Sequence, residues 1–179
     1  MANTYNMKIA GLERELPLCE ASDNLDIAAF IMFGDVELTQ ACATELIKKC
    51  PEHDVLLTAE AKGIPLCYEM ARQENKPYLV CRKGKKVYME NPIGVEVKSI
   101  TTQNLQRLFL GKKDIDLMKG KKILVVDDVI STGESLRVLE SFVEVAKGEI
   151  AAKVAVLAEG DAADRDDIVF LEKLPLFFK

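Results

Sequence analysis

Apolar residues follow two spacings along this chain. Five short runs are almost continuously apolar, which is typical of strands buried on both faces of a sheet. Between these runs, apolar residues recur every three or four positions, as they do in helices that cover a sheet. The predicted strands are 54–59, 77–81, 122–128, 152–158 and 168–171, and the predicted helices are 38–50, 63–72 and 133–147. Because strands and helices alternate, we expect a parallel sheet with right-handed crossovers.

Two stretches depart from this alternation. Residues 1–37 are mixed, and their short apolar runs end at Gly34. A basic loop that begins at Arg82 leads into two half-polar strands, 95–101 and 106–110, which we interpret as an excursion from the main sheet. The chain therefore reads as one α/β core with a small N-terminal addition and an inserted pair of strands.

Composition and charge exclude several classes of function. The 179 residues fit one domain with a small appendage. Lys and Arg total 24 against 29 Asp and Glu, so the formal net charge is −5. A chain this acidic is a poor candidate for a sequence-independent binder of nucleic acid or of an anionic membrane. Its apolar runs are too short to span a bilayer and its N-terminus lacks the pattern of a secretion signal, so we expect a cytoplasmic protein.

Cysteine and histidine usage points away from a metal centre. The cysteines are odd in number, widely spaced and without a C-x-x-C pair, which fits reduced thiols, mostly in the core. They are Cys19, Cys42, Cys50, Cys67 and Cys81. The single histidine, His53, lies in a predicted loop, where we expect a surface role. A His-rich metal site or a His-based catalytic triad is therefore not expected.

The segment Ile123-Leu-Val-Val-Asp-Asp-Val-Ile-Ser-Thr-Gly-Glu-Ser135 carries the candidate chemistry. A buried strand delivers Asp127 and Asp128 to its carboxyl end, the edge at which parallel sheets bind ligands. The small hydroxyl residues and the glycine that follow lead directly into a helix, and their backbone N–H groups form a cradle suited to a phosphate monoester. The carboxylates can accept hydrogen bonds from a diol. A diol and a phosphate about one sugar ring apart indicate a ribose 5-phosphate.

The same segment is compatible with other structures. Receiver domains of response regulators begin with a similar strand and acid pair, but residues 129–179 are less than half of what a receiver needs downstream. Ser-Thr-Gly before a helix can also serve only as a cap. Neither G-x-x-x-x-G-K-[ST] nor G-x-G-x-x-G occurs, so triphosphate and dinucleotide sites are unsupported.

The whole segment resembles the phosphoribosyl-diphosphate motif of the type I phosphoribosyltransferases. The resemblance extends over about 25–178 and is closest to the purine branch, the adenine and xanthine enzymes. It implies an α/β fold with a central parallel sheet flanked by helices, a small N-terminal hood and a β flap. The hood, which holds the base in this family, would be 1–37, and the core would be 38–179 with the flap at about 84–110.

The resemblance also implies roles for individual residues. Asp127 and Asp128 would hold the ribose hydroxyls, directly or through water on Mg²⁺. The 5′-phosphate would lie in the loop formed by Ser131, Thr132, Gly133, Glu134 and Ser135, with Glu134 itself pointing away as an acid in the first helical turn. The stretch Ala59-Glu-Ala-Lys-Gly63 matches the diphosphate loop, so Lys62, together with the basic pair Arg82 and Lys83, would receive the diphosphate leaving group.

The match departs from the family pattern around the base. Adenine enzymes carry a flap glutamate that handles the purine proton, and Thr101 stands at its place here; Glu90 and Glu96 are the nearest flap acids. The Ser-Ile-Thr-Thr-Gln stretch at 99–103 is more similar to the xanthine branch. Phe30 and Phe33 are candidates for stacking on a base, with core packing as the alternative. Glu159 and Asp161 are candidates for base amino groups, with a solvated turn as the alternative.

The sequence thus predicts a purine salvage enzyme that uses phosphoribosyl diphosphate, Mg²⁺ and a purine base, with adenine as the first choice. Xanthine and hypoxanthine/guanine are the alternatives within the class. A regulator of the same fold that binds the donor without turning it over is the alternative from another class, although no helix-turn-helix segment is evident. The resemblance implies a homodimer and implies neither a nucleic-acid nor a membrane partner.

Overall fold

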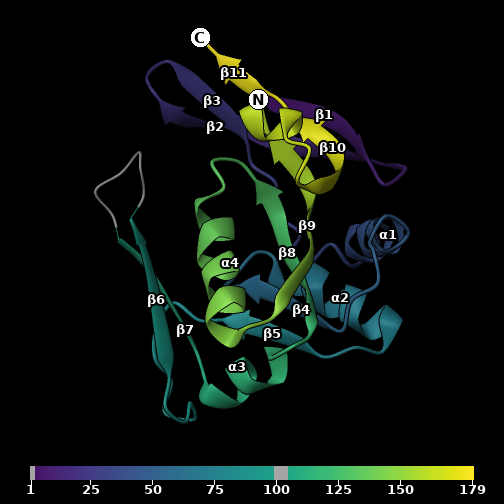
Figure 1. Ribbon diagram of the computed structural model, residues 1–179. Coiled ribbons are helices and arrows are strands. Elements are labelled where there is room, and N and C mark those ends of the chain that lie inside the picture. The colour runs from purple at the N-terminus through teal and green to yellow at the C-terminus, as the bar shows by residue number, and fades with distance from the viewer. Residues whose placement is uncertain (1–2, 99–104) are drawn as a thin grey trace.

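Five parallel strands form the centre of the molecule (Figure 1). The computed structural model describes residues 3–98 and 105–179, so Thr101 and its neighbours lie outside it. The sheet has the order β10-β9-β8-β4-β5. Its strands are β4 (Val55–Ala59), β5 (Tyr78–Cys81), β8 (Lys122–Ile130), β9 (Glu149–Glu159) and β10 (Val169–Leu174). The predicted parallel α/β sheet is confirmed.

Helices cover both faces of this sheet, as Figure 1 shows. Alternate residues of β8 point to opposite sides. On one face, Leu124 and Val126 pack with the buried side chains of the helices α1 (Val36–Ile47) and α2 (Ile64–Glu74). Ile123 and Val125 pack against α3 (Lys112–Met118) and α4 (Glu134–Ala146). A strand buried on both faces needs apolar residues at every position, which explains the continuous run in the sequence.

A four-stranded antiparallel sheet forms the hood at the top of Figure 1. It contains β1 (Thr4–Ile9), β2 (Leu12–Ser22), β3 (Leu25–Ala28) and β11 (Leu176–Phe178). A turn at Ala10 and Gly11, both with positive φ, joins β1 to β2. The C-terminal strand β11 pairs with β3, so this sheet is built from both ends of the chain.

The inserted pair of strands, β6 (Ile93–Lys98) and β7 (Leu105–Leu110), forms an antiparallel ribbon beside α4. The backbones of Arg82 and Phe109 exchange two hydrogen bonds, of 2.9 and 2.8 Å, which tie this flap to the loop after β5. Helix α3 follows directly. The apolar pattern did not predict it, because only Ile115 and Met118 of this short, charged helix are buried.

The surface role expected for His53 is wrong. Its side chain is buried, with 3% of the residue exposed. Nδ1 lies 2.9 Å from the carbonyl oxygen of Pro51, and Nε2 lies 2.9 Å from Glu74 Oε2 at the end of α2. Both ring nitrogens therefore have polar partners, which is what allows the imidazole to leave the solvent.

Three of the cysteines, Cys42, Cys67 and Cys81, lie in the core, while Cys50 is partly buried and Cys19 is exposed. Burial raises the pKa of the Cys50 thiol to about 11.

Among the residues described, no helix is both long and apolar enough to cross a membrane.

Candidate active site

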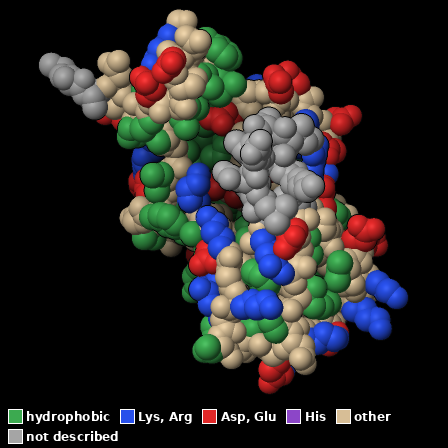
Figure 2. Space-filling model, turned by 90° about the vertical axis from the view of Figure 1, so that its left-hand side faces the viewer, with side chains coloured by type: hydrophobic (Ala, Val, Ile, Leu, Met, Phe, Trp, Pro, Cys, Tyr) green, Lys and Arg blue, Asp and Glu red, His purple; other side chains and the backbone are tan. Residues whose placement is uncertain are grey.

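The carboxyl ends of the central strands line an open cleft of about 850 Å³ beneath the hood. Across the sheet from β10 to β5, the residues at this edge are Leu174, Glu159, Asp127 with Asp128, Lys62 and Lys83. Leu174 and Glu159 therefore lie on one side of the acid pair, and Lys62 and Lys83 lie on the other. Figure 2 shows this region hollowed below the hood, with Lys and Arg side chains along its lower margin.

Asp127 and Asp128 lie at the middle of the cleft, on β8. Asp127 Oδ1 accepts a hydrogen bond of 2.9 Å from the backbone N–H of Asp128. Asp128 is only 3% exposed, and its Oδ2 lies 3.0 Å from the Lys62 ammonium. Burial, and then the charge of Asp128, raise the pKa of Asp127 to about 8, while Lys62 opposes the shift.

Gly63 allows the loop after β4 to approach these acids. A Cβ added at Gly63 would lie 2.6 Å from Thr58 Oγ1 and 3.3 Å from the Cα of Asp127. Any side chain here would push the loop away from β8. The close approach is what brings Lys62 within ion-pair distance of Asp128.

The loop between β8 and α4 encloses a small cavity of about 40 Å³ that adjoins the cleft. Its lining includes Ser131, Thr132, Gly133, Glu134 and Ser135. Gly133 has a φ of 77° and precedes the first residue of α4, so the cavity lies at a helix N-terminus. N–H groups and the helix dipole at such a place favour an anion. Glu134 lines the same cavity and lies in the first turn of α4.

Arg165, which the sequence analysis did not single out, packs behind this loop. A Cβ at Gly133 would lie 2.8 Å from Arg165 Nη1. Asp167 holds the guanidinium through bonds of 2.8 Å from Nε and 2.7 Å from Nη2. These contacts, led by the Arg165 bond, hold the pKa of the Asp167 carboxyl well below its usual range. Arg165 follows the loop by about 30 residues and lies in a polar turn, so no local spacing could have indicated its contact with Gly133.

The two cations of the basic pair point in different directions. Lys83 lines the cleft, whereas Arg82 does not. Arg82 Nε lies 3.2 Å from Glu60 Oε2, and Arg82 Nη1 donates a hydrogen bond of 2.7 Å to the hydroxyl of Tyr88. Glu60 also accepts a 2.9 Å bond from the backbone N–H of Lys83. These contacts, led by the Lys83 bond, lower the pKa of the Glu60 carboxyl and clamp the loop after β4 to the loop after β5.

The flap adds a cation that the sequence analysis missed. Arg107, on β7, lines the cleft with about half of its side chain exposed. Its guanidinium lies 5.0 Å from the centre of the Phe109 ring, and its Nε lies 2.9 Å from Glu96 Oε1. Positions two apart on a strand share a face, so the Arg-x-Phe spacing was the available signal.

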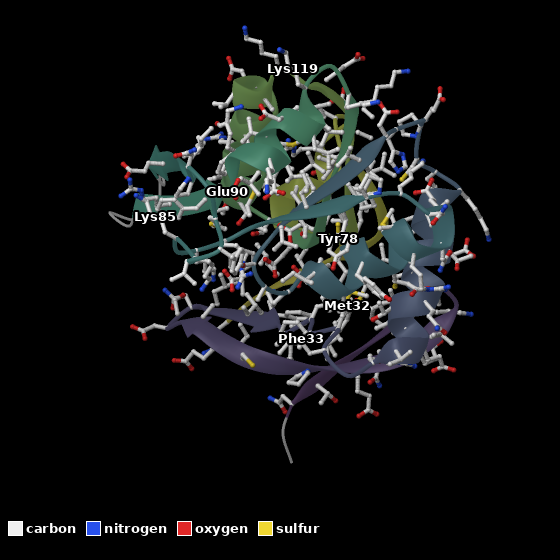
Figure 3. The ribbon with its side chains drawn as sticks, turned by 90° about the horizontal axis from the view of Figure 1, so that it is seen from below. Met32, Phe33, Tyr78, Lys85, Glu90 and Lys119 are labelled. Atoms are coloured by element: carbon white, nitrogen blue, oxygen red, sulfur yellow. The ribbon has the colours of Figure 1, made fainter. Side chains whose placement is uncertain are left out.

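The two candidate stacking residues differ in position. Phe30, just after β3, lines the cleft and is 3% exposed. Phe33 is 54% exposed and does not line it; Figure 3 shows Phe33 beside the hood, away from Lys85 and Glu90. Glu159 lines the cleft from the end of β9, whereas Asp161 is exposed and lies outside it.

Comparison with known proteins identifies the family. A family profile described as "Phosphoribosyl transferase domain" matches residues 36–174. This chain belongs to that family. The hypoxanthine/guanine phosphoribosyltransferase of Methanothermococcus okinawensis is 33% identical over 129 residues, which are 72% of this chain and 67% of that protein. These matches support the type I purine branch.

Two further matches show how far the phosphoribosyltransferase similarity extends. The purine biosynthesis transcriptional repressor PurR of Bacillus subtilis is 27% identical over 113 residues, and the match covers 63% of this chain but only 39% of the repressor. A solved adenine phosphoribosyltransferase from Thermoanaerobacter pseudethanolicus superimposes with a TM-score of 0.74 at 17% identity, covering 88% of this chain and 95% of that one. At that identity the likeness shows the phosphoribosyltransferase fold alone.

Proposed function

We propose that this phosphoribosyltransferase chain is a purine salvage enzyme that transfers a phosphoribosyl group from phosphoribosyl diphosphate to a purine base, with adenine as the first choice. The observation that carries this proposal is the order of groups along one sheet edge. Cations, a carboxylate pair with an adjoining anion cradle, and an apolar wall follow one another in a single cleft. This order matches the diphosphate, the ribose 5-phosphate and the base of the two substrates.

Each group then has a role in the displacement. The N–H groups of 131–135 bind the 5′-phosphate, and Lys62 and Lys83 neutralise the diphosphate. A ring nitrogen of the base attacks C1 of the ribose, the bond from C1 to the diphosphate oxygen breaks, and the proton on that nitrogen leaves to solvent. Asp127 and Asp128 accept hydrogen bonds from the ribose hydroxyls and favour the positive charge that develops on the sugar. The hood and the flap hold both substrates in place and keep water away from C1 of the ribose.

The carboxylates also fit a magnesium ion. Phosphoribosyltransferases generally use Mg²⁺ with phosphoribosyl diphosphate. Asp128 Oδ2 is buried and, among the described residues, pairs with the Lys62 ammonium at 3.0 Å without accepting a hydrogen bond, so it keeps capacity for a cation or for a water on one. No group of three or more metal-ligating side chains occurs among the described residues, so an ion here would take most of its ligands from the substrate and water. When bound, the ion would neutralise charge on the leaving diphosphate.

A sensor is the second candidate, because PurR is among the similar proteins. Such a chain would bind the donor without consuming it. Xanthine and hypoxanthine/guanine are the alternative bases for the enzyme. We further propose that the hood (1–37) holds the base over the core (38–179). We also propose a homodimeric assembly, with Arg82 at the dimer or diphosphate contact, and a cytoplasmic location.

The deciding experiment is diphosphate release with phosphoribosyl diphosphate, Mg²⁺ and each purine base in turn. We expect release with at least one base, and loss of release in the double variant Asp127→Asn/Asp128→Asn with an unchanged circular dichroism spectrum. Absence of release with every base, together with tight donor binding, would overturn the enzyme and favour the sensor. Near-normal release by the double variant would remove the acid pair from the site.

A further inference from the structure

Glu159 is a carboxylate of the cleft that has no hydrogen-bond partner among residues 3–98 and 105–179. It is the last residue of β9, half-buried, and it lines the cleft. No side chain or backbone group in the described part of the chain forms a hydrogen bond with its carboxylate. Burial raises the pKa of Glu159, and the charge of Lys62 partly opposes this. A desolvated carboxylate without a partner is costly, and such a group at a cleft wall points to a ligand that supplies the missing donors.

The surroundings of Glu159 place it on the hood side of the acid pair. Glu159 is the register partner of Leu174 at the end of β10. A Cβ on the adjacent Gly160 would lie 2.9 Å from Leu176 Cδ1, and Leu176 pairs with Ile27 of the hood. The nearby cleft wall is apolar and is formed by Ile27, Ala28, Ala29, Phe30, Ile31 and Leu174. The carboxylate thus lies at the rim of an apolar wall, between the hood and the proposed ribose position at Asp127.

We infer that Glu159 determines base specificity, and that its carboxylate accepts N–H bonds from the exocyclic amine of an aminopurine. This inference rests on the proposed function and names its substrate class. A flat base against the apolar wall would present its edge to Glu159. Adenine carries an amine at position 6 and guanine carries one at position 2, whereas hypoxanthine and xanthine carry neither.

The chemistry of the carboxylate also works against the other bases. An ionised carboxylate accepts hydrogen bonds and cannot donate them. A carbonyl oxygen at the place of the amine would face it as a second acceptor, and the resulting repulsion adds to the lost bond. Lys62 does not compensate, because its ammonium lies 3.0 Å from Asp128 and would turn to the diphosphate when the donor binds. The site therefore both attracts an amine and disfavours an oxygen.

The test compares base preference in the wild type and in Glu159→Gln, whose side chain has the same shape but can donate as well as accept. We expect the wild type to prefer either adenine or guanine over hypoxanthine by about tenfold to a hundredfold in kcat/KM. The adenine–hypoxanthine pair tests the position 6 amine, and the guanine–hypoxanthine pair tests the position 2 amine. Glu159→Gln should reduce the preference about tenfold or more while leaving the KM for phosphoribosyl diphosphate within twofold.

Asp161→Asn is the matched control, since Asp161 is an exposed acid two positions away and outside the cleft. It should leave the preference unchanged. Binding of AMP, GMP and IMP by calorimetry gives a second readout that needs no turnover. If the wild type turns over bases but Glu159→Gln keeps the same preference, the inference about Glu159 is wrong and the proposed enzyme stands. If no base reacts but AMP or GMP binds more tightly than IMP and Glu159→Gln abolishes the difference, the enzyme is wrong and Glu159 stands.

Discussion

Lys62 Nζ lies 3.0 Å from Asp128 Oδ2, across the neighbouring carboxyl ends of β4 and β8. One partner is half exposed and the other is buried. The contact therefore joins the proposed diphosphate side of the cleft to the proposed ribose side. A bound diphosphate would draw the ammonium away from Asp128 and free that carboxylate for a ribose hydroxyl.

Replacing Lys62 tests this relationship. In Lys62→Met we expect kcat/KM for phosphoribosyl diphosphate to fall about tenfold to a hundredfold, because a charge-assisted contact with the donor is lost. Lys48→Met is the control: Lys48 is similarly exposed and pairs with Glu45 at 2.6 Å, outside the cleft. Equal kcat/KM in the two variants would show that Lys62 does not meet the donor.

The raised pKa of Asp127 predicts how stability depends on pH. The folded chain binds the Asp127 proton more tightly than the unfolded chain, so this group favours folding at acid pH and loses that contribution as pH rises toward about 8. Asp127→Asn removes the ionisation. We expect its Tm to exceed that of the wild type by about 2–8 °C at pH 8.5 and by much less at pH 5.5.

Thermal unfolding at the two pH values measures the effect, and Asp23→Asn, an exposed acid in the turn between β2 and β3, is the control. A pH-independent difference between Asp127→Asn and the wild type would mean that Asp127 is ionised throughout. Activity should be lost in Asp127→Asn at both pH values, since an amide binds the diol poorly.

The relative positions of Asp127, Asp128 and the loop 131–135 could be predicted because these residues are contiguous. Residues 127–135 lie on one strand end, one turn and one helix start, so the order of residue types already determines their relative positions. The positions of Lys62 and Lys83 could also be predicted from the sequence, because each residue follows a predicted buried strand and parallel strands end at the same edge.

The remaining features depend on contacts between distant parts of the chain. Arg165 meets Gly133 only after η1 (Gly160–Asp164) turns the chain back over the loop. Arg82 precedes Lys83 directly, yet Glu60 holds it away from the cleft. His53 is buried because Glu74, from the far end of α2, pairs with it. Local spacing carries no information on any of these contacts.

Arg107 should contribute to the binding of phosphoribosyl diphosphate and not to the stability of the fold. In Arg107→Gln we expect the KM for phosphoribosyl diphosphate to rise about tenfold, since the flap loses a cation that faces the cleft. Arg72→Gln is matched in exposure, 54% against 53%, and in having a glutamate partner, Glu69 at 2.7 Å. Steady-state kinetics distinguish the two, and a KM unchanged in both variants would remove Arg107 from the donor site.

Gly133 should be needed both for its backbone conformation and for the space beside it. Gly133→Ala places a methyl group at a φ of 77° and within 2.8 Å of Arg165 Nη1, so the loop or the arginine must move. Gly120→Ala is the matched control, because Gly120 has a φ of 66° and nothing within 4 Å of the added carbon. Both variants should lose about 1–2 kcal/mol of stability from left-handed strain. Only Gly133→Ala should also weaken binding of ribose 5-phosphate, by about tenfold or more in a calorimetric titration. Equal affinities in the two variants would mean that the loop does not hold the phosphate.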